Sequence, residues 1–324
     1  MPALILAVAE VADGALTKLS AEAATLARSL AEAAGGSALG LVVDAAPDGP
    51  ATELAGYLPR VIAVASEAVA GQVPAPHVAA EVARLLGEGV THVVIGATTD
   101  GRDIAGTLVG LTGLGLLANA DEAAWEGGGP VTRSVVLGGK AVTRSMFTGA
   151  SGLITLRPGG VTALAAAAPG SVEQRAAAAP TVPAATVLDR VAEAGAEVSL
   201  EDARVVVVGG RGVGSPEGFA IVDELAGLLG GVSGATRASV DAGWVPYARQ
   251  IGQTGRVVKP ALYIGLGVSG AMQHRVGMQG SESIIAINRD QDAPIAEVAD
   301  LFVIGDLFEV APALAAEIRA RRGS

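Results

Sequence analysis

A glycine-rich turn in the last third of the chain carries the clearest chemical signal. Gly265, Gly267 and Gly270 follow an apolar run and precede a predicted helix. This is the G-x-G-x-x-G spacing of a dinucleotide fingerprint in its usual strand-to-helix setting. Glycines let the backbone approach a pyrophosphate closely, the start of a helix offers unpaired N–H groups, and Ser269 adds a hydroxyl. The turn therefore predicts nucleotide binding, with a turn needed only for helix–strand packing as the alternative.

A second glycine-rich turn, Gly209–Gly214, comes earlier in the chain and also follows an apolar strand. It contains Arg211, whose guanidinium can clamp a phosphate. A packing turn with a solvated arginine fits the same residues equally well. Downstream of the fingerprint, the next predicted strand ends at Asn288, which places a polar side chain where a ribose or an adenine would lie.

Small polar side chains concentrate between the two turns, in a domain that is otherwise aliphatic. They fall in the segments Gly234–Arg237, Asp241–Tyr247 and Gln250–Gly255. A single loop threonine would carry no signal, and a lone histidine such as His274 is more often structural than functional. Together, however, these residues favour a site lined by hydrogen-bond donors. The chain has no cysteine, which excludes disulfides, thiolate nucleophiles and cysteine-ligated clusters.

The elements that must position these residues alternate between strands and helices, so the sequence predicts an α/β protein with two Rossmann-like parallel-sheet domains. Half of the residues are hydrophobic, only 3% are aromatic and 45 are glycine, a mixture typical of such folds. In the second domain we expect strands at Val205–Val208, Ala261–Gly265, Ser283–Ile287 and Leu301–Ile304, and a last helix at Phe308–Arg319.

The first domain shows the same rhythm. Its predicted strands are Leu4–Ala9, Ala38–Val43, Val61–Ala65, His92–Ile95 and Gly152–Leu156, and its predicted helices are Ser20–Ala34 and His77–Leu86. The runs Val131–Leu137 and Ala141–Phe147 flank Gly138-Gly139-Lys140, which predicts a hairpin.

The chain is expected to divide into residues 1–195 and 196–324, with the boundary near Gly195–Leu200. An Ala/Pro/Gly-rich segment, 158–183, closes the first domain; it should be loose or lie extended over a surface, because it has few large residues to bury. The next run, Ala184–Ala192, is expected to be ordered and to return to the first domain.

Charge and hydropathy exclude several classes of protein. The 324-residue chain has a net charge of −11, which argues against binding nucleic acid. Ile104–Ala120 carries no charge, but its Gly, Thr and Asn residues favour a buried helix followed by a strand over a membrane span. The N-terminal residues favour a strand over a signal peptide, so we expect a cytoplasmic protein.

Several motifs, taken in order, resemble the FAD domain of electron transfer flavoprotein alpha subunits. The resemblance is strong over Arg204–Leu314 and rests on Gly209-Gly-Arg-Gly, Gly234-Ala-Thr-Arg, Gly252-Gln-Thr-Gly, Leu262–His274, Ile285–Asp290, Ala293-Pro-Ile295, Ala299-Asp300 and Gly305–Phe308. In the first domain it rests only on the α/β rhythm and on Gly101-Arg-Asp103. Thr236 stands where many members have serine and Arg256 where lysine is common, and both changes keep the chemistry.

The resemblance implies the alpha subunit of a heterodimer that carries electrons and has no substrate turnover of its own. FAD would lie on the second domain, a nucleotide-binding-like first domain would hold no cofactor, and the beta subunit would hold AMP or a second FAD. Donors would be flavoprotein dehydrogenases, such as the acyl-CoA dehydrogenases of fatty acid beta-oxidation. The acceptor would be a membrane-associated quinone oxidoreductase.

The resemblance also assigns roles to individual residues. Arg211 and Thr236 would contact phosphate or the nearby flavin chain, and Arg237 would lie over the isoalloxazine. The ring would be lined by Gln250, Ile251, Gly252, Gln253 and Thr254. The run Ser269, Gly270, Ala271, Met272, Gln273 and His274 would bind the pyrophosphate at its start and the ring at His274. The adenosine end would be held by Asn288, Asp306 and Leu307.

Two other functions remain compatible with parts of the sequence. The fingerprint with Asp290 on the next strand suits an NAD(P)-binding module of a transhydrogenase-like or thiamine-enzyme-like oxidoreductase, although such a module does not need the Gln-Thr-Gly segment. A non-enzymatic nucleotide-sensing protein would rest on the first domain alone.

Overall fold

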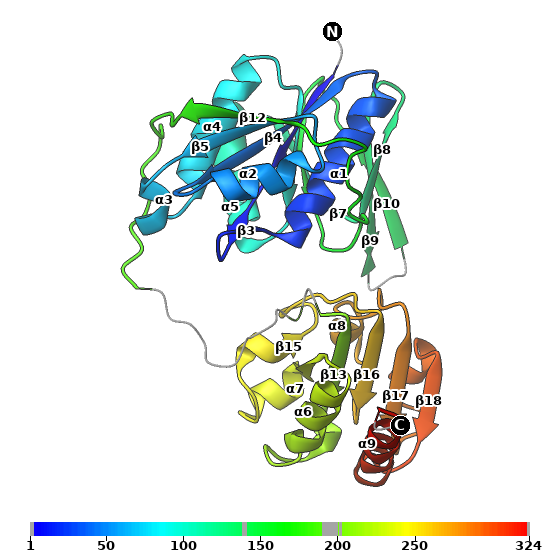
Figure 1. Ribbon diagram of the computed structural model, residues 1–324. Helices are drawn as coiled ribbons and strands as arrows, with labels where there is room; N and C mark the ends of the chain where they lie inside the picture. The colour runs from blue at the N-terminus through cyan, green and yellow to red at the C-terminus, as the bar shows by residue number, and fades with distance from the viewer. Residues whose placement is uncertain (1–2, 138–140, 190–199, 201–202, 323–324) are drawn as a thin grey trace. The chain divides into compact units, whose positions relative to one another are not determined.

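The computed structural model describes residues 3–137, 141–189, 200 and 203–322 (Figure 1). The chain divides into two compact units, residues 1–191 and 192–324, each with hydrophobic cores of its own. The boundary that the sequence predicts near Gly195–Leu200 falls almost entirely outside the described residues. Both units are built on large parallel sheets, which confirms the predicted α/β class.

Unit 1 contains a seven-stranded parallel sheet in the order β12-β5-β4-β1-β6-β11-β7. Its strands are β1 (Leu4–Val8), β4 (Ser37–Asp44), β5 (Arg60–Ala65), β6 (His92–Gly96), β7 (Gly115–Ala120), β11 (Gly152–Leu156) and β12 (Ser171–Ala176). Its helices are α1 (Lys18–Ala33), α2 (Asp48–Ala55), α3 (Ala68–Gly71), α4 (Ala75–Gly87) and α5 (Thr99–Thr112). The uncharged stretch is thus the body of α5 followed by β7, as predicted.

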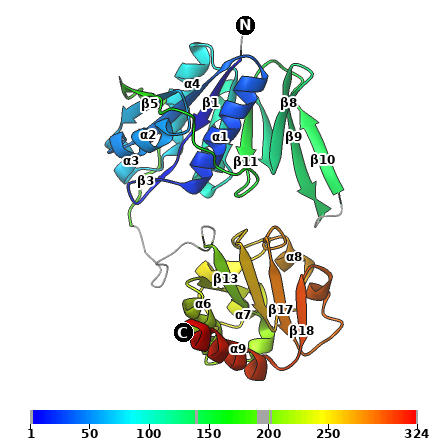
Figure 2. The same cartoon turned by 45° about the vertical axis from the view of Figure 1, so that its right-hand side comes forward.

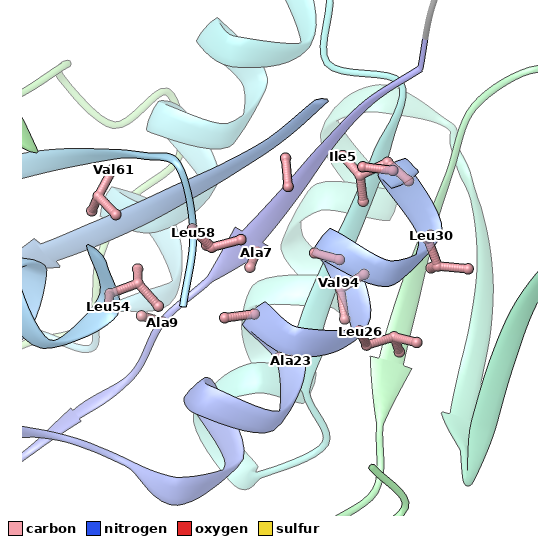
Figure 3. Packing of buried hydrophobic residues seen from close by; sticks show 14 of the residues in the cluster. Ile5, Ala7, Ala9, Ala23, Leu26, Leu30, Leu54, Leu58, Val61 and Val94 are labelled. Carbon is pink, nitrogen blue, oxygen red and sulfur yellow. The ribbon is translucent and has the colours of Figure 1, made fainter. Parts of the chain in front are cut away.

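The helices cover both faces of this sheet because its central strands are apolar on both sides. Ile5 and Ala7 of β1 pack with α1 and α2, whereas Leu6 and Val8 pack with α4 and α5. Figure 3 shows the first of these layers, with Leu26 of α1 among the labelled residues.

Two smaller sheets complete unit 1. β2 (Val11–Ala12) pairs with β3 (Ala15–Leu16), and β8 (Glu122–Glu126), β9 (Gly129–Val136) and β10 (Ala141–Met146) form an antiparallel sheet beside α1 (Figure 2). The predicted hairpin is therefore the β9–β10 pair. Its predicted turn, Gly138–Lys140, lies outside the described residues.

The Ala/Pro/Gly-rich segment lies extended across unit 1 and is fastened by polar contacts along its length. Gly159 N donates to Glu22 Oε2 at 2.8 Å, and Arg28 Nη2 donates to Leu164 O at 2.8 Å. Further along the segment β12 pairs with β5, and just beyond the segment Val73 N donates to Ala185 O at 2.9 Å.

A protein carboxylate lies where the strand order of unit 1 reverses, between β1 and β6. Glu10 follows β1, and Thr98 Oγ1 donates to its two carboxylate oxygens at 2.6 and 2.8 Å. Thr98 also caps α5 by accepting from Gly101 N at 2.9 Å. A Cβ on Gly101 would lie 2.8 Å from Glu10 Oε1 and 1.9 Å from the Gly96 carbonyl oxygen. Burial raises the pKa of Glu10, the bond from Thr98 lowers it and nearby Asp100 raises it further.

Unit 2 contains a six-stranded parallel sheet in the order β15-β14-β13-β16-β17-β18. Its strands are β13 (Val205–Gly209), β14 (Val232–Thr236), β15 (Gln250–Ile251), β16 (Leu262–Leu266), β17 (Ile284–Asn288) and β18 (Leu301–Ile304). Its helices are α6 (Phe219–Leu228), α7 (Arg237–Asp241), α8 (Met272–Arg275) and α9 (Leu307–Arg322), with 3-10 turns at Arg211–Val213, Tyr247–Arg249 and Pro294–Glu297. The predicted last helix lies within α9.

The strand order of unit 2 reverses between β13 and β16, and this is where parallel α/β sheets bind ligands. The two glycine-rich turns meet there without an intervening side chain. Gly210 N donates to Leu266 O at 2.9 Å and Gly212 N donates to Gly267 O at 3.1 Å. A Cβ on Gly210 would lie 2.3 Å from Gly267 O, and one on Gly212 would lie 2.8 Å from Gly267 Cα. Only glycine fits at this crossing.

The Glu10 environment predicts a pH-dependent stability. A carboxyl whose pKa is raised on folding contributes most stability below its ordinary pKa of 4.5, and that contribution is lost as pH rises through the folded value. Glu10→Gln keeps an acceptor for Thr98 and has no charge. The stability of the variant relative to wild type should therefore rise between acidic and neutral pH.

Urea unfolding followed by Trp125 fluorescence, in a Trp244→Phe background, measures this difference in unit 1. The exposed Glu67→Gln is the control, and a difference that does not change with pH would contradict the burial of the Glu10 charge.

The glycine crossing predicts that one added methyl group lowers the free energy of unfolding at some positions and not at others. Gly210→Ala should destabilise unit 2 by about 1–3 kcal/mol or more, because its Cβ overlaps backbone that cannot move without shifting β16. Gly227→Ala on α6, where a Cβ meets open space, should be neutral or stabilise by about 0.5–1 kcal/mol. Trp244 fluorescence during urea unfolding, in a Trp125→Phe background, compares the two variants. Equal midpoints would show that the turns are not in contact.

Candidate dinucleotide site

The fingerprint turn keeps its shape through left-handed glycines and bonds to neighbouring loops. Gly267 and Gly270 have φ of +61° and +78°, which favour glycine strongly. A Cβ on Gly270 would lie 2.4 Å from Ile295 N, and that N–H donates to Ser269 O at 3.1 Å. The side chain of Asn288 donates to Val268 O at 2.9 Å. The turn is therefore a fixed strip of backbone close to the surface, with exposed Ser269 at its tip.

The helix that follows is shorter than the fingerprint predicts. α8 contains only four residues, Met272–Arg275. Its dipole is correspondingly small, so a pyrophosphate here would depend mainly on backbone N–H groups and side chains. Ala271, Met272 and Gln273 are exposed beside the turn. On the facing turn, Arg211 is also exposed, and its side chain makes no hydrogen bond or ion pair within the part of the chain that the structure describes.

The loop after β15 is tied to α8 by backbone contacts. Gln253 N donates to Gln273 O at 2.7 Å, and Gly252, with φ +139°, packs against Gly277, whose Cβ would lie 2.5 Å from Gly252 Cα. The buried Gln250 side chain donates to Thr254 Oγ1 at 3.1 Å. The loop therefore presents the exposed side chains of Gln253 and Thr254 from a rigid base.

His274 is buried, and both of its ring nitrogens face protein groups. Nε2 lies 2.8 Å from the Tyr263 hydroxyl, and Nδ1 lies 3.0 Å from Ile251 O. Burial lowers the pKa of His274 to about 4, although the bond to the Ile251 carbonyl opposes part of that decrease. The imidazole is thus neutral at physiological pH. Tyr263 is fully buried, and burial raises its pKa, so its hydroxyl keeps its proton.

Thr236 and Arg237 lie at the end of β14 and differ in exposure. The Thr236 hydroxyl is buried 3.3 Å from Ser239 Oγ. Arg237 projects into solvent with its side chain 67% exposed, and its Nε donates to Asp241 at 3.2 Å. This exposed ion pair can exchange partners at little cost, so the guanidinium is available to a ligand.

The last group of predicted residues lies at the end of β17 and just after β18. Asn288 Oδ1 accepts from Asp290 N at 3.1 Å, and Asp306 Oδ1 accepts from Phe308 N at 2.9 Å. Leu307 is buried against the fingerprint, since a Cβ on Gly267 would lie 2.9 Å from Leu307 Cδ2. Leu307 therefore supports the turn more than it faces solvent.

All the predicted site residues lie at the carboxyl edge of the unit 2 sheet, at or after the ends of its six strands. They are Arg211, Thr236, Arg237, Gln250–Thr254, Ser269–His274, Asn288, Asp306 and Leu307. Tyr263 and Ser239, which support this edge from below, are not among the predicted site residues. The signal for Tyr263 was available, because it is one of only three tyrosines and stands in an otherwise aliphatic strand.

Neither metal binding nor membrane insertion finds support among the described residues. They include no group of three or more His, Asp or Glu side chains that could hold a metal ion. They also include no helix that is long and apolar enough to cross a membrane.

Comparison with known proteins identifies both units. Residues 5–186 match the electron transfer flavoprotein domain, and residues 199–279 match the electron transfer flavoprotein FAD-binding domain. The first match covers the unit where the motifs were weakest. The second makes FAD the cofactor of unit 2 and disfavours the NAD(P) alternative.

Individual relatives give the same result, two of them over almost the whole chain. The chain is 43% identical to electron transfer flavoprotein subunit alpha of Mycobacterium tuberculosis, over 98% of this chain and 99% of that protein. It is 41% identical to the same subunit of Mycobacterium leprae, again over 98% and 99%. With the subunit of Paracoccus denitrificans it shares 52% identity over 41% and 42% of the two chains. The chain belongs to the electron transfer flavoprotein alpha-subunit family.

Proposed function

We propose that this chain is the alpha subunit of a heterodimeric electron carrier and that it holds FAD at the carboxyl edge of the unit 2 sheet. The convergence of residues from all six strands on that edge carries the proposal, together with the glycine crossing between β13 and β16. The glycine crossing presents bare backbone with hydrogen-bond donors nearby, which is what a pyrophosphate needs. A beta subunit, which the family implies, is the partner.

Each group of residues is assigned to one part of the cofactor according to its exposure and chemistry. Ser269, Gly270 and Ala271 offer backbone and hydroxyl donors to the pyrophosphate, with Arg211 on the facing turn and Thr236 near the flavin chain. Asn288, Asp306 and Leu307 border the adenosine end. The ring is bordered by Gln250, Ile251, Gly252, Gln253, Thr254, Met272, Gln273 and His274.

Arg237 supplies the positive charge at the ring. Bound FAD accepts and donates electrons, and its reduction places negative charge on the ring. Because His274 is held neutral by burial, it cannot balance that charge. Arg237 is the exposed cation at the end of β14 and becomes more effective when a ligand displaces water from it.

Unit 1 is proposed to carry no nucleotide. Its strand order reverses at Glu10, whose carboxylate is bound to Thr98 at the start of α5. A negative charge from the protein thus lies where this fold would receive a phosphate, and it would repel one. This placement counts against a nucleotide sensor built on unit 1 alone.

The physiological setting follows from the family and completes the proposal. Electrons would arrive from flavoprotein dehydrogenases, including acyl-CoA dehydrogenases of fatty acid beta-oxidation, and leave to a membrane-associated quinone oxidoreductase. The chain would act in the cytoplasm as a carrier without its own turnover. The beta subunit would hold AMP or a second FAD.

Cofactor content tests the proposed function directly. The full chain co-expressed with its beta subunit should purify as a yellow heterodimer. Acid release and chromatography should give either one FAD with one AMP, or two FAD, per heterodimer. A colourless heterodimer that takes up no added FAD would reject the proposal.

The charge at Arg237 should set part of the reduction potential. In Arg237→Ala the potential should fall, since loss of a nearby cation disfavours the reduced, more negative flavin. Loss of one unit charge in water-like surroundings is worth about 1 kcal/mol, or about 20 mV for a two-electron couple. Spectroelectrochemistry of the flavinated heterodimer measures it. Arg237→Lys should retain most of the potential, and Arg319→Ala on α9, which removes an exposed arginine paired with Glu224, should leave it unchanged. An unchanged potential in flavinated Arg237→Ala would remove this role.

A further inference from the structure

A buried chain of three polar groups joins the fingerprint strand to the loop after β15. The Tyr263 hydroxyl on β16 lies 2.8 Å from His274 Nε2, and His274 Nδ1 lies 3.0 Å from the carbonyl of Ile251 at the end of β15. Tyr263 has no exposed surface and His274 is 6% exposed. Polar groups at this depth are expected to be engaged with one another, since an unmatched one is costly.

The chemistry of the three groups leaves only one arrangement of protons. The Ile251 carbonyl can only accept, so His274 Nδ1 must carry the hydrogen. A neutral imidazole has a single N–H, so Nε2 is an acceptor and the Tyr263 hydroxyl must donate to it. The Ile251 carbonyl therefore sets the tautomer of His274, and the Tyr263 hydroxyl, which can donate or accept, anchors the imidazole by donating to Nε2.

The first glycine of the fingerprint makes room for this tyrosine. A Cβ on Gly265 would lie 3.1 Å from Tyr263 Cε1 and 3.5 Å from its hydroxyl oxygen. Gly265 does not have a left-handed backbone, unlike Gly267 and Gly270, so backbone shape is not what requires glycine here. The ring of Tyr263 lies in the core with Val206 and Ala286, which leaves its hydroxyl as the part that reaches the site.

The hydrogen-bond chain from Tyr263 through His274 to Ile251 holds the loop that borders the ring site. Ile251 is the last residue before Gly252, and the loop is closed on α8 by the bond from Gln253 N to Gln273 O. Exposed Gln253 and Thr254 project from the same loop. A change in the His274 tautomer would replace the donor facing Ile251 by a lone pair, and two acceptors would then face each other.

We propose that Tyr263 is a positioning residue for the FAD site: its hydroxyl donates to Nε2 of His274 and anchors the imidazole, so that the Nδ1–H group holds Ile251 and the ring-bordering loop in place. The inference rests on the proposed function for its link to FAD, and on the geometry of the protein alone for the tautomer. His274 then acts on the ring site mainly through the loop, since its only N–H is used on Ile251.

The tautomer is measured first, in the heterodimer with 15N-labelled histidine at neutral pH. His274→Gln identifies the His274 signals by subtraction. Wild type should show a protonated Nδ1 and an unprotonated Nε2. The opposite tautomer in wild type would overturn the proposal, and this readout needs no mutation of Tyr263 and no bound flavin.

The second measurement removes only the hydroxyl. Tyr263→Phe should keep the Nδ1–H tautomer, since the Ile251 carbonyl still accepts, but should shift the 15N signal of Nε2, which loses its donor. It should also weaken FAD binding about tenfold, the scale of one lost buried hydrogen bond. FAD binding to the heterodimer stripped of flavin is followed by quenching of flavin fluorescence. Tyr57→Phe in unit 1 is the matched control and should change neither readout. A Tyr263→Phe heterodimer whose Nε2 signal does not shift, or whose FAD affinity is unchanged, would overturn the positioning role.

Failure of the inference is distinguishable from failure of the proposed function. If wild type, control and variant all bind no FAD while His274 shows the expected tautomer, the FAD assignment fails and the tautomer assignment stands. If wild type and control bind FAD and Tyr263→Phe binds it equally well, the FAD assignment stands and the positioning role fails. If Tyr263→Phe does not fold, the wild-type spectrum still decides the tautomer.

Discussion

The direct contact of two backbones at the centre of the unit 2 sheet is the constraint on which the site depends. Where Gly210 meets Gly267, any side chain would push β13 and β16 apart. Strand pairing continues to the ends of both strands because nothing intervenes, and the following turns lie side by side. The remaining four strands are then added outward in both directions. A residue after any strand therefore arrives at the same edge, which explains how segments more than ninety positions apart can border one ligand.

The polar residues at that edge fall into two sets with different physical roles. Buried groups such as His274 and Thr236 are engaged with other protein atoms. Exposed groups such as Arg237 and Thr254 have solvent on at least one side. A low-dielectric interior explains this division, since a buried polar group must be satisfied before any ligand arrives. The buried polar groups are thus fixed before a ligand binds. A ligand then only exchanges water for protein contacts at the exposed groups.

The sequence predicts this arrangement well wherever local pattern and tertiary structure agree. Runs of Val and Ile in the main strands are recognisable because these strands are buried on both faces, and each motif follows a strand end. β12 was not predicted, since Ser-Val-Glu-Gln-Arg-Ala has little apolar character and is placed by pairing with β5 and by an ion pair from Arg60 to Glu173 at 2.6 Å. β15 has only two residues, too few to show a period. The Tyr263–His274 bond joins residues eleven positions apart and depends on the tertiary fold, so no local pattern reveals it.

The carboxylate of Glu10 has a consequence for how the two halves of the chain respond to their surroundings. A fold stabilised by a ligand gains free energy with the logarithm of ligand concentration, so its folded population follows the supply of that ligand. Unit 2 has such a dependence on FAD. In unit 1 the corresponding place already holds a group of the chain itself, at an effective concentration that never changes. Scarcity of flavin would then loosen one half of the molecule and leave the other half fully formed.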